Sequence, residues 1–209
     1  MKTRLMGSVT VAAALLLASC ERSQPSPTTP TPAANDPAKT DQPAAAAAPA
    51  AISDEAPPAM VFAAGIVFDA PPGWKQVAPA NPMRLAEVRV ADASGDASRD
   101  CLLTVSTAGG DIDMNIDRWT RQMRTPSGEP PEPDVRVIES GGLKVHVVVL
   151  EGSYQGMTDP APLPEWMMRG AIVENPGSAT VFIKMTGPAA AMRSISDGWA
   201  SLVSSIRKP

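Results

Sequence analysis

The chain has 209 residues, of which 44% are hydrophobic and 4% aromatic, and its formal net charge is −4. A negative net charge, without a run of basic residues, disfavours a broad nucleic-acid-binding face or a surface patch that binds anionic lipids. Two cysteines and one histidine exclude a disulfide-rich scaffold and a zinc site built from several histidines.

Residues 1–19 resemble the signal peptide of a bacterial lipoprotein. A basic start leads into an apolar stretch, and the small residues Ala18 and Ser19 come directly before Cys20. Small residues permit cleavage just before Cys20, whose thiol then accepts a diacylglycerol chain. We expect lipidation of Cys20 and anchoring in the cell envelope, facing the periplasm. The open alternatives are an ordinary secretory signal with a chance cysteine and an uncleaved apolar anchor.

The residue after the cysteine is Glu21. In the lipoproteins that the segment resembles, aspartate at this position retains the protein in the inner membrane of enteric bacteria. The outer membrane is therefore slightly favoured over the inner membrane.

Residues 20–58 consist mostly of Pro, Ala, Thr and Ser. Such a segment has few large apolar side chains to bury, so it cannot offset the entropy of ordering. We expect a disordered tether that spans on the order of 35 Å as a flexible coil. It would hold the folded part off the lipid surface.

Residues 59–209 have the length of a single globular domain. Alternating or apolar runs bounded by turn residues predict strands at 65–69, 85–91, 101–107, 135–139, 144–152, 168–174 and 180–186. Helical spacing of apolar residues predicts helices at 111–124 and 188–206, with Trp119 and Trp199 as their main core anchors. The short turns favour antiparallel pairing, because parallel neighbours need a longer crossover. We expect an α+β fold in which two helices flank an antiparallel sheet of about six to seven strands.

Cys101 has no disulfide partner within the chain if Cys20 carries lipid. It shares one face of a predicted strand with Leu103 and Val105, which favours a core thiol over a redox or nucleophilic role.

The run 111–117 places oxygen-bearing side chains at alternate positions, as the first half of a calcium loop does. The sixth position is Ile116 where glycine is needed, and the twelfth is Gln122 where glutamate is needed. Acidic residues also suit the start of a helix. The pattern favours a capped helix, with calcium as the weaker alternative.

His146 alternates with Lys144 and Val148 in a predicted strand, and we expect it on the less buried face. A ligand or acid–base role is the weaker alternative. The methionines Met157, Met167, Met168 and Met185 allow a copper(I) site, but their irregular spacing favours core filling. No G-x-S-x-G motif is present. We predict no catalytic residue, no metal site and no cofactor.

Segment 155–166 contains Gly156 and prolines at 160, 162 and 164, and it leads into Trp166 and Met167. A stiff loop that ends in an aromatic residue suits partner contact, because little entropy is lost on binding. Trp166 and Met167 are therefore candidate partner-binding residues. The sequence favours the alternative, in which Trp166 folds back over the sheet.

Several short motifs resemble an uncharacterised family of exported bacterial proteins. They are Pro71, Pro72, Gly73 and Trp74; Met83, Arg84, Ala86 and Glu87; Asn115, Ile116, Asp117, Arg118, Trp119 and Gln122; Gly152, Ser153 and Tyr154; and Lys184, Met185, Thr186, Gly187 and Pro188. Members of that family are usually labelled hypothetical or membrane proteins, so this resemblance implies no activity.

The order of strands and helices also resembles the PsbP-like fold, an antiparallel sheet between helices. That fold is found in a photosystem II extrinsic subunit, a small-GTPase-binding protein and bacterial lipoproteins. The resemblance implies binding or stabilising of partners more than catalysis.

The favoured function is a lipid-anchored, non-catalytic partner-binding or assembly module of the cell envelope that binds no nucleic acid. The alternatives are a small-ligand or metal-ion carrier and an envelope enzyme of unrecognised type. A deep polar pocket would favour the carrier, a flat apolar patch at Trp166 a protein partner, and a cleft with a perturbed acid or base an enzyme.

Overall fold

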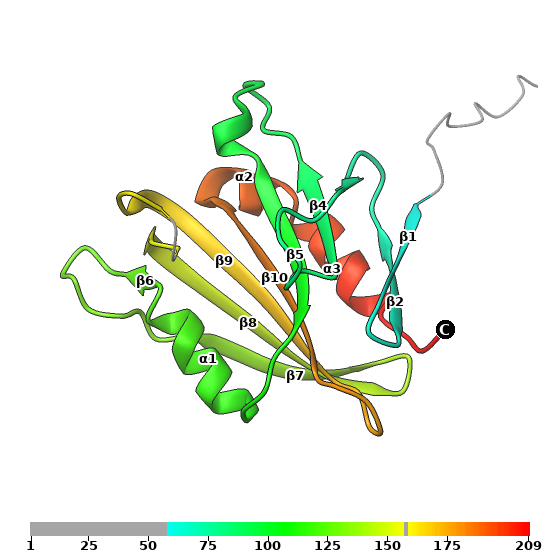
Figure 1. The fold of residues 1–209 in the computed structure, drawn as a ribbon. Coiled ribbons are helices and arrows are strands. Elements are labelled where there is room, and N and C mark those ends of the chain that lie inside the picture. The colour runs from blue at the N-terminus through cyan, green and yellow to red at the C-terminus, as the bar shows by residue number, and fades with distance from the viewer. Residues whose placement is uncertain (1–57, 157–158) are drawn as a thin grey trace, which may run out of the picture. The chain divides into compact units, whose positions relative to one another are not determined.

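The computed structural model describes residues 58–156 and 159–209 (Figure 1). The predicted signal peptide, Cys20 and the tether up to residue 57 lie outside the described residues. Within the described ranges, no helix is both long enough and apolar enough to cross a bilayer.

Within these ranges the main sheet has eight strands, and all of its pairings are antiparallel. The spatial order is β3 (Lys75–Val77), β4 (Ala86–Val90), β5 (Cys101–Thr107), β10 (Val181–Pro188), β9 (Leu163–Glu174), β8 (Leu143–Tyr154) and β6 (Met123–Arg124), and β7 (Asp134–Ser140) pairs with β8. A separate hairpin is formed by β1 (Ala59–Ala63) and β2 (Ile66–Ala70). The predicted α+β class and antiparallel sheet are confirmed, with more strands than the six to seven expected.

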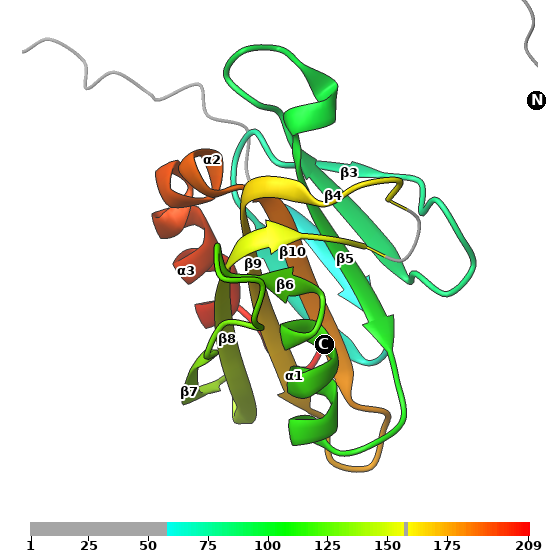
Figure 2. The same ribbon diagram turned by 90° about the vertical axis from the view of Figure 1, so that its left-hand side faces the viewer.

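Helices cover both faces of the sheet. The helices α2 (Ala189–Ser194) and α3 (Ser196–Ser204), with the β1–β2 hairpin, pack on one face. Helix α1 (Ile112–Thr120) packs on the other face, which we call the α1 face. Figure 2 shows α2 and α3 on one side of the sheet and α1 on the other. Trp119 and Trp199 are 4% and 5% exposed, so both predicted anchors are confirmed.

The first helix is shorter than predicted. It ends at Thr120, and Met123 lies in β6, paired with Tyr154 of β8. The prediction of a helix through residue 124 is wrong because strand pairing also buries Met123 completely. The side chain of Asp111 accepts a hydrogen bond from the Met114 N–H (2.7 Å), so the capped-helix interpretation of this segment is confirmed.

The predicted C-terminal helix is two helices. Ile195, with φ −103° and ψ 21°, ends α2 and precedes α3. The hydroxyl of Ser196 donates to the carbonyl of Arg193 (2.6 Å), a local bond that competes with continuous helix. Ile206 follows α3 and is fully buried, as its place in the predicted stripe requires.

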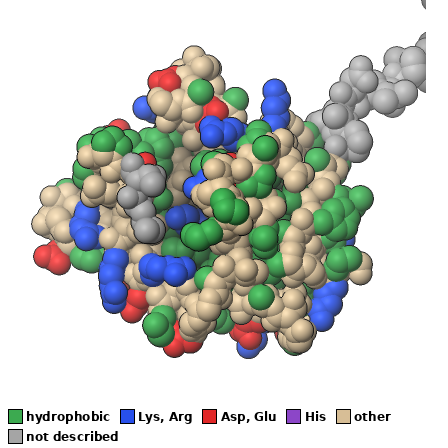
Figure 3. All heavy atoms as spheres, viewed as in Figure 1, with side chains coloured by type: hydrophobic (Ala, Val, Ile, Leu, Met, Phe, Trp, Pro, Cys, Tyr) green, Lys and Arg blue, Asp and Glu red, His purple; other side chains and the backbone are tan. Residues whose placement is uncertain are grey.

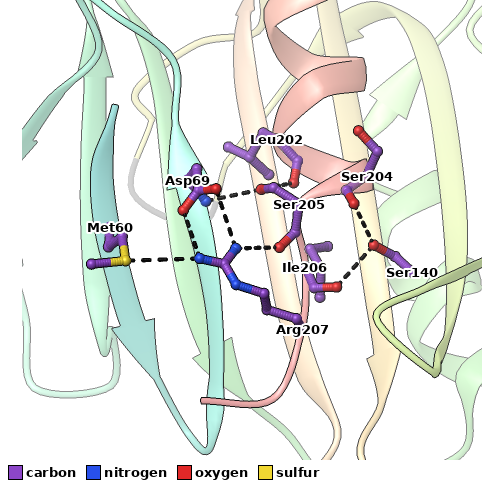
Figure 4. Close-up of polar contacts among 8 residues, drawn as sticks. All are labelled: Met60, Asp69, Ser140, Leu202, Ser204, Ser205, Ile206 and Arg207. Carbon is purple, nitrogen blue, oxygen red and sulfur yellow. Dashed lines mark hydrogen bonds and ion pairs between the residues drawn. The ribbon is translucent and has the colours of Figure 1, made fainter. Parts of the chain in front are cut away.

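The C-terminal segment fastens the hairpin to the domain (Figure 4). Arg207 and Val67 exchange two backbone hydrogen bonds of 2.8 and 3.0 Å, and the Arg207 side chain pairs with Asp69 at 3.0 Å. The hydroxyl of Ser140 donates to the carbonyl of Ile206 at 2.8 Å. These contacts hold the hairpin beside α3 and keep it on the face opposite α1.

Candidate functional site

Helix α1 packs on only part of the α1 face. Strand register places Glu87, Thr104, Lys184 and Gly170 in one row across β4, β5, β10 and β9. Trp119 of α1 rests on Gly170, where an added Cβ would lie 2.1 Å from the ring. The cover provided by α1 therefore ends beside Lys184, and Figure 1 shows β4 and β5 beyond it.

Lys184 is partly buried and has few polar partners. Its ammonium group donates a hydrogen bond to Oε1 of Gln122 (3.2 Å) and lies 5.7 Å from the ring centroid of Tyr154, within the range of a cation–π interaction. Among the described residues, no carboxylate lies within ion-pair distance of it. An ammonium group has three donor hydrogens, so two have no described partner.

Further positive charge surrounds this lysine. Arg84 and Arg118 lie close enough to influence its titration. We call the region formed by Arg84, Arg118, Gln122, Tyr154 and Lys184 the basic hollow. Figure 3 shows Lys and Arg side chains gathered around a hollow on this face.

The pKa of Lys184 reflects this environment. Burial is the main cause that lowers the pKa of Lys184 to about 8; the charges of Arg84 and Arg118 contribute to this shift, and the Asp159 carboxylate opposes it. At neutral pH the lysine is still mostly charged. An anion bound beside it would favour the charged form and raise this pKa.

The neighbouring acids keep their usual charge at neutral pH. Burial acts to raise the pKa of Glu87, but hydrogen bonds from the Arg84 side chain and from the Ala80 N–H (3.1 Å) outweigh it and hold the pKa below its ordinary value. Burial, together with nearby Asp159, raises the pKa of Tyr154. Glu87 therefore stays ionised and Tyr154 stays protonated near neutrality, so the pKa of neither group is matched to proton exchange at that pH.

Replacement of Lys184 by methionine tests this electrostatic environment. The folded-state pKa of about 8 lies below the ordinary 10.5, so wild type gains stability from this group as pH rises between those values. We expect Lys184→Met to be more stable than wild type at pH 7, by on the order of 1–2 kcal/mol. Urea unfolding at pH 7 and pH 10 should show this advantage shrinking at the higher pH, and a constant difference would contradict the lowered pKa.

The candidate residues from the sequence lie elsewhere. Trp166 and Met167 belong to β9, which begins at Leu163, and they are 9% and 5% exposed. The expected irregular segment through Trp166 is wrong, because Trp166 pairs with Gly152 of β8 and Pro188 of β10. The structure does not bring them to the basic hollow, and partner binding at these residues stays a prediction.

The structure also places Cys101 and His146, the two further residues considered as candidates in the sequence. Cys101 is 2% exposed, and its burial raises the pKa of the thiol to about 11, which confirms a core thiol. His146 is partly exposed and Lys144 on the same face is exposed, whereas Leu143 and Val145 on the opposite face are buried, so His146 lies on the locally less buried face, as expected. Its Nε2 lies 2.7 Å from Oε1 of Glu174, an ordinary polar contact at the sheet surface.

Reasoning from the sequence did not identify Lys184 as a site residue, although the motifs that resemble the exported family include it. Those motifs also contain Arg84, Arg118, Gln122 and Tyr154, and the structure gathers all of them. The available signal was a lysine inside an otherwise apolar strand, flanked by Ile183 and Met185. Lysine is seldom buried without a partner.

No protein-family model matches the chain, and no curated protein matches it. Among solved structures, cyanobacterial PsbP from Synechocystis sp. PCC 6803 is similar with a TM-score of 0.48 and 12% identity, over 78% of this chain and 99% of that chain. LpqN, involved in cell envelope biogenesis of Mycobacterium tuberculosis, has a TM-score of 0.47 and 8% identity, over 74% of this chain and 87% of that chain. A protein of unknown function from Pseudomonas aeruginosa has a TM-score of 0.35 and 10% identity, over 71% of this chain and 95% of that chain. The expected PsbP-like resemblance thus recurs among solved structures, but at these scores and identities it carries no argument about function.

Proposed function

We propose that this protein is a lipid-anchored, non-catalytic binding module of the cell envelope that binds an anionic group of its partner in the basic hollow. Lys184 carries this proposal, because its partly buried ammonium group has no carboxylate within ion-pair distance among the described residues. The net charge of the whole chain is −4. Because the rest of the protein is negative on balance, a local cluster of positive charge would direct anions to this face.

The anchor in this proposal is Cys20, preceded by the signal pattern and followed by the Pro- and Ala-rich tether. Lipid on Cys20 would place the domain in the periplasm, with the outer membrane slightly favoured. The tether would let the basic hollow reach a partner away from the lipid surface.

Binding accounts for the hollow better than acid–base catalysis does. A lysine with a lowered pKa is also found in active sites, but chemistry of this kind needs a second group that exchanges a proton. Glu87 is held ionised by Arg84, and Tyr154 is held protonated by burial. A small-ligand carrier is the second candidate function, favoured by a separate cavity at the end of the sheet.

Anion binding can be observed at Lys184 directly. The chain after residue 19 has five lysines, at 39, 75, 144, 184 and 208, so ¹³C-dimethylation gives a simple NMR spectrum. We expect inorganic phosphate or acetate, added at constant ionic strength, to shift the Lys184 signal to saturation. Affinity should fall about tenfold per pH unit above the Lys184 pKa of about 8, because only the charged lysine binds the anion.

Two matched variants complete this experiment. Lys184→Met identifies the signal and should weaken binding at least tenfold, as measured by the saturation of nearby backbone amide signals. Lys144→Met removes an exposed lysine that pairs with Glu174 at 3.3 Å and should leave binding unchanged. Parallel, unsaturated shifts of all five lysine signals with both anions would contradict the proposal.

A further inference from the structure

A second concave region lies at the end of the sheet, where β8 ends, β9 begins and β10 leads into α2. It is an open cavity of about 670 Å³, which we call the sheet-end pocket. This volume falls within the range of small-molecule sites. Its apolar wall is formed by Trp166, Pro126, Pro164, Pro188 and Ala189.

Two arginines supply positive charge to the sheet-end pocket. Arg99, at the end of the short helix η1 (Ala97–Arg99), and Arg124 of β6 both line it. Neither forms an ion pair with a carboxylate among the described residues. The Arg124 guanidinium donates to the carbonyls of Arg121 (2.7 Å) and Met123 (2.8 Å). Backbone carbonyls thus hold this guanidinium in place without neutralising it.

Positive charge continues behind the pocket wall. Arg193 lines the pocket and pairs with Glu151. Arg169 lies near Arg193, is 9% exposed, and has a buried Nη1 without a described hydrogen-bond partner. Of the four arginines at this corner of the domain, only Arg193 pairs with a carboxylate among the described residues; Arg99, Arg124 and Arg169 do not.

A strained β-bulge between β8 and β9 forms the remaining wall of the sheet-end pocket. The β8–β9 register shifts between Gly152 and Tyr154, so that Pro164 and Glu165 lie opposite Ser153 alone. Glu165 has φ +54°, a conformation that residues other than glycine seldom adopt. It is exposed and lines the pocket. Bulges of this kind redirect side chains beside binding sites, and strain that is kept in a fold points to a functional position.

We propose that the sheet-end pocket is a second binding site, for a small organic acid with a ring-sized apolar body and a hydrogen-bond donor. Arg99 and Arg124 pair with its acidic group, the apolar body packs against Trp166 and the prolines, and Glu165 accepts the donor hydrogen. This site is separate from the basic hollow, so neither proposal depends on the other.

The test uses indole-3-acetate, which combines a carboxylate, an aromatic body and an N–H donor. The mature chain contains four tryptophans, Trp74, Trp119, Trp166 and Trp199, so incorporation of 5-fluorotryptophan gives four ¹⁹F signals, of which Trp166→Phe identifies one. We expect the Trp166 signal to shift to saturation while the other three stay in place. Equal, unsaturated shifts of all four signals would overturn the proposal.

Variants separate this site from the basic hollow. Arg99→Ala and the Arg99→Ala/Arg124→Ala pair should weaken indole-3-acetate binding at least tenfold. Arg136→Ala, at an exposed residue of β7 that pairs with Asp134, and Lys184→Met should bind as wild type does. Undiminished binding by Arg99→Ala and by the double variant would overturn the assignment.

The positive φ of Glu165 leads to a separate prediction about stability and binding. Glu165→Gly should raise the urea midpoint of unfolding, because glycine adopts positive φ without strain. The same change should weaken indole-3-acetate binding at least threefold, because the acceptor is lost. Binding equal to wild type would remove Glu165 from the site.

Discussion

Gly170→Ala should unfold at markedly lower urea concentration than wild type. An alanine Cβ would lie 2.1 Å from Cζ3 of Trp119 and 2.9 Å from two further ring atoms. The ring cannot move freely, because it packs edge-on against Phe182, with centroids 6.0 Å apart and an interplanar angle of 83°. Overpacking of this kind costs about 3 kcal/mol. Equilibrium unfolding followed by tryptophan fluorescence gives the value.

The control for Gly170→Ala is Gly109→Ala, in the loop before α1. An added Cβ there meets no atom within 4 Å, so stability should change by less than about 0.5 kcal/mol. The displaced helix in Gly170→Ala should also shift Gln122 away from Lys184 and weaken phosphate binding. A Gly170→Ala protein as stable as wild type would show that Trp119 does not rest on β9.

Cys20→Ala should abolish incorporation of labelled palmitate. Lipid attaches to the thiol of Cys20 in our proposal, and no other residue of the signal pattern can replace it. Cys101→Ala is the matched control, because Cys101 is buried in the core at 2% exposure, and its label should equal that of wild type. The label is the primary measurement, since an uncleaved signal segment would also sediment with membranes. Label retained in Cys20→Ala would contradict the anchor.

Local sequence patterns predicted much of the fold. The strand at 101–107 has the predicted bounds, because its apolar residues alternate and turn residues bound it. The spacing of Met123 fits the first helix, and only its pairing with Tyr154 places it in a strand. The strand β3 was missed because Lys75, Gln76 and Val77 are too few and too polar to give a period.

The candidate site was less accessible to sequence reasoning. Lys184 is held by Gln122 and Tyr154, which come from other parts of the chain. No local spacing relates these residues, because strand order and the position of α1 bring them together. The prolines at 160, 162 and 164 predict an irregular segment up to Trp166, with Trp166 folded over the sheet as the favoured interpretation; pairing with Gly152 and Pro188 instead places Trp166 within β9.

Photocrosslinking in living cells tests the binding role of the basic hollow most directly. Thr104 is the cross-strand neighbour of Lys184 and shares its face, so a photoreactive residue at position 104 of the lipidated protein would report what enters the hollow. We predict that one dominant envelope component is captured in the wild-type background and that its capture falls at least tenfold with Lys184→Met but not with Lys144→Met. No capture, or equal capture in all three backgrounds, would contradict the proposed function.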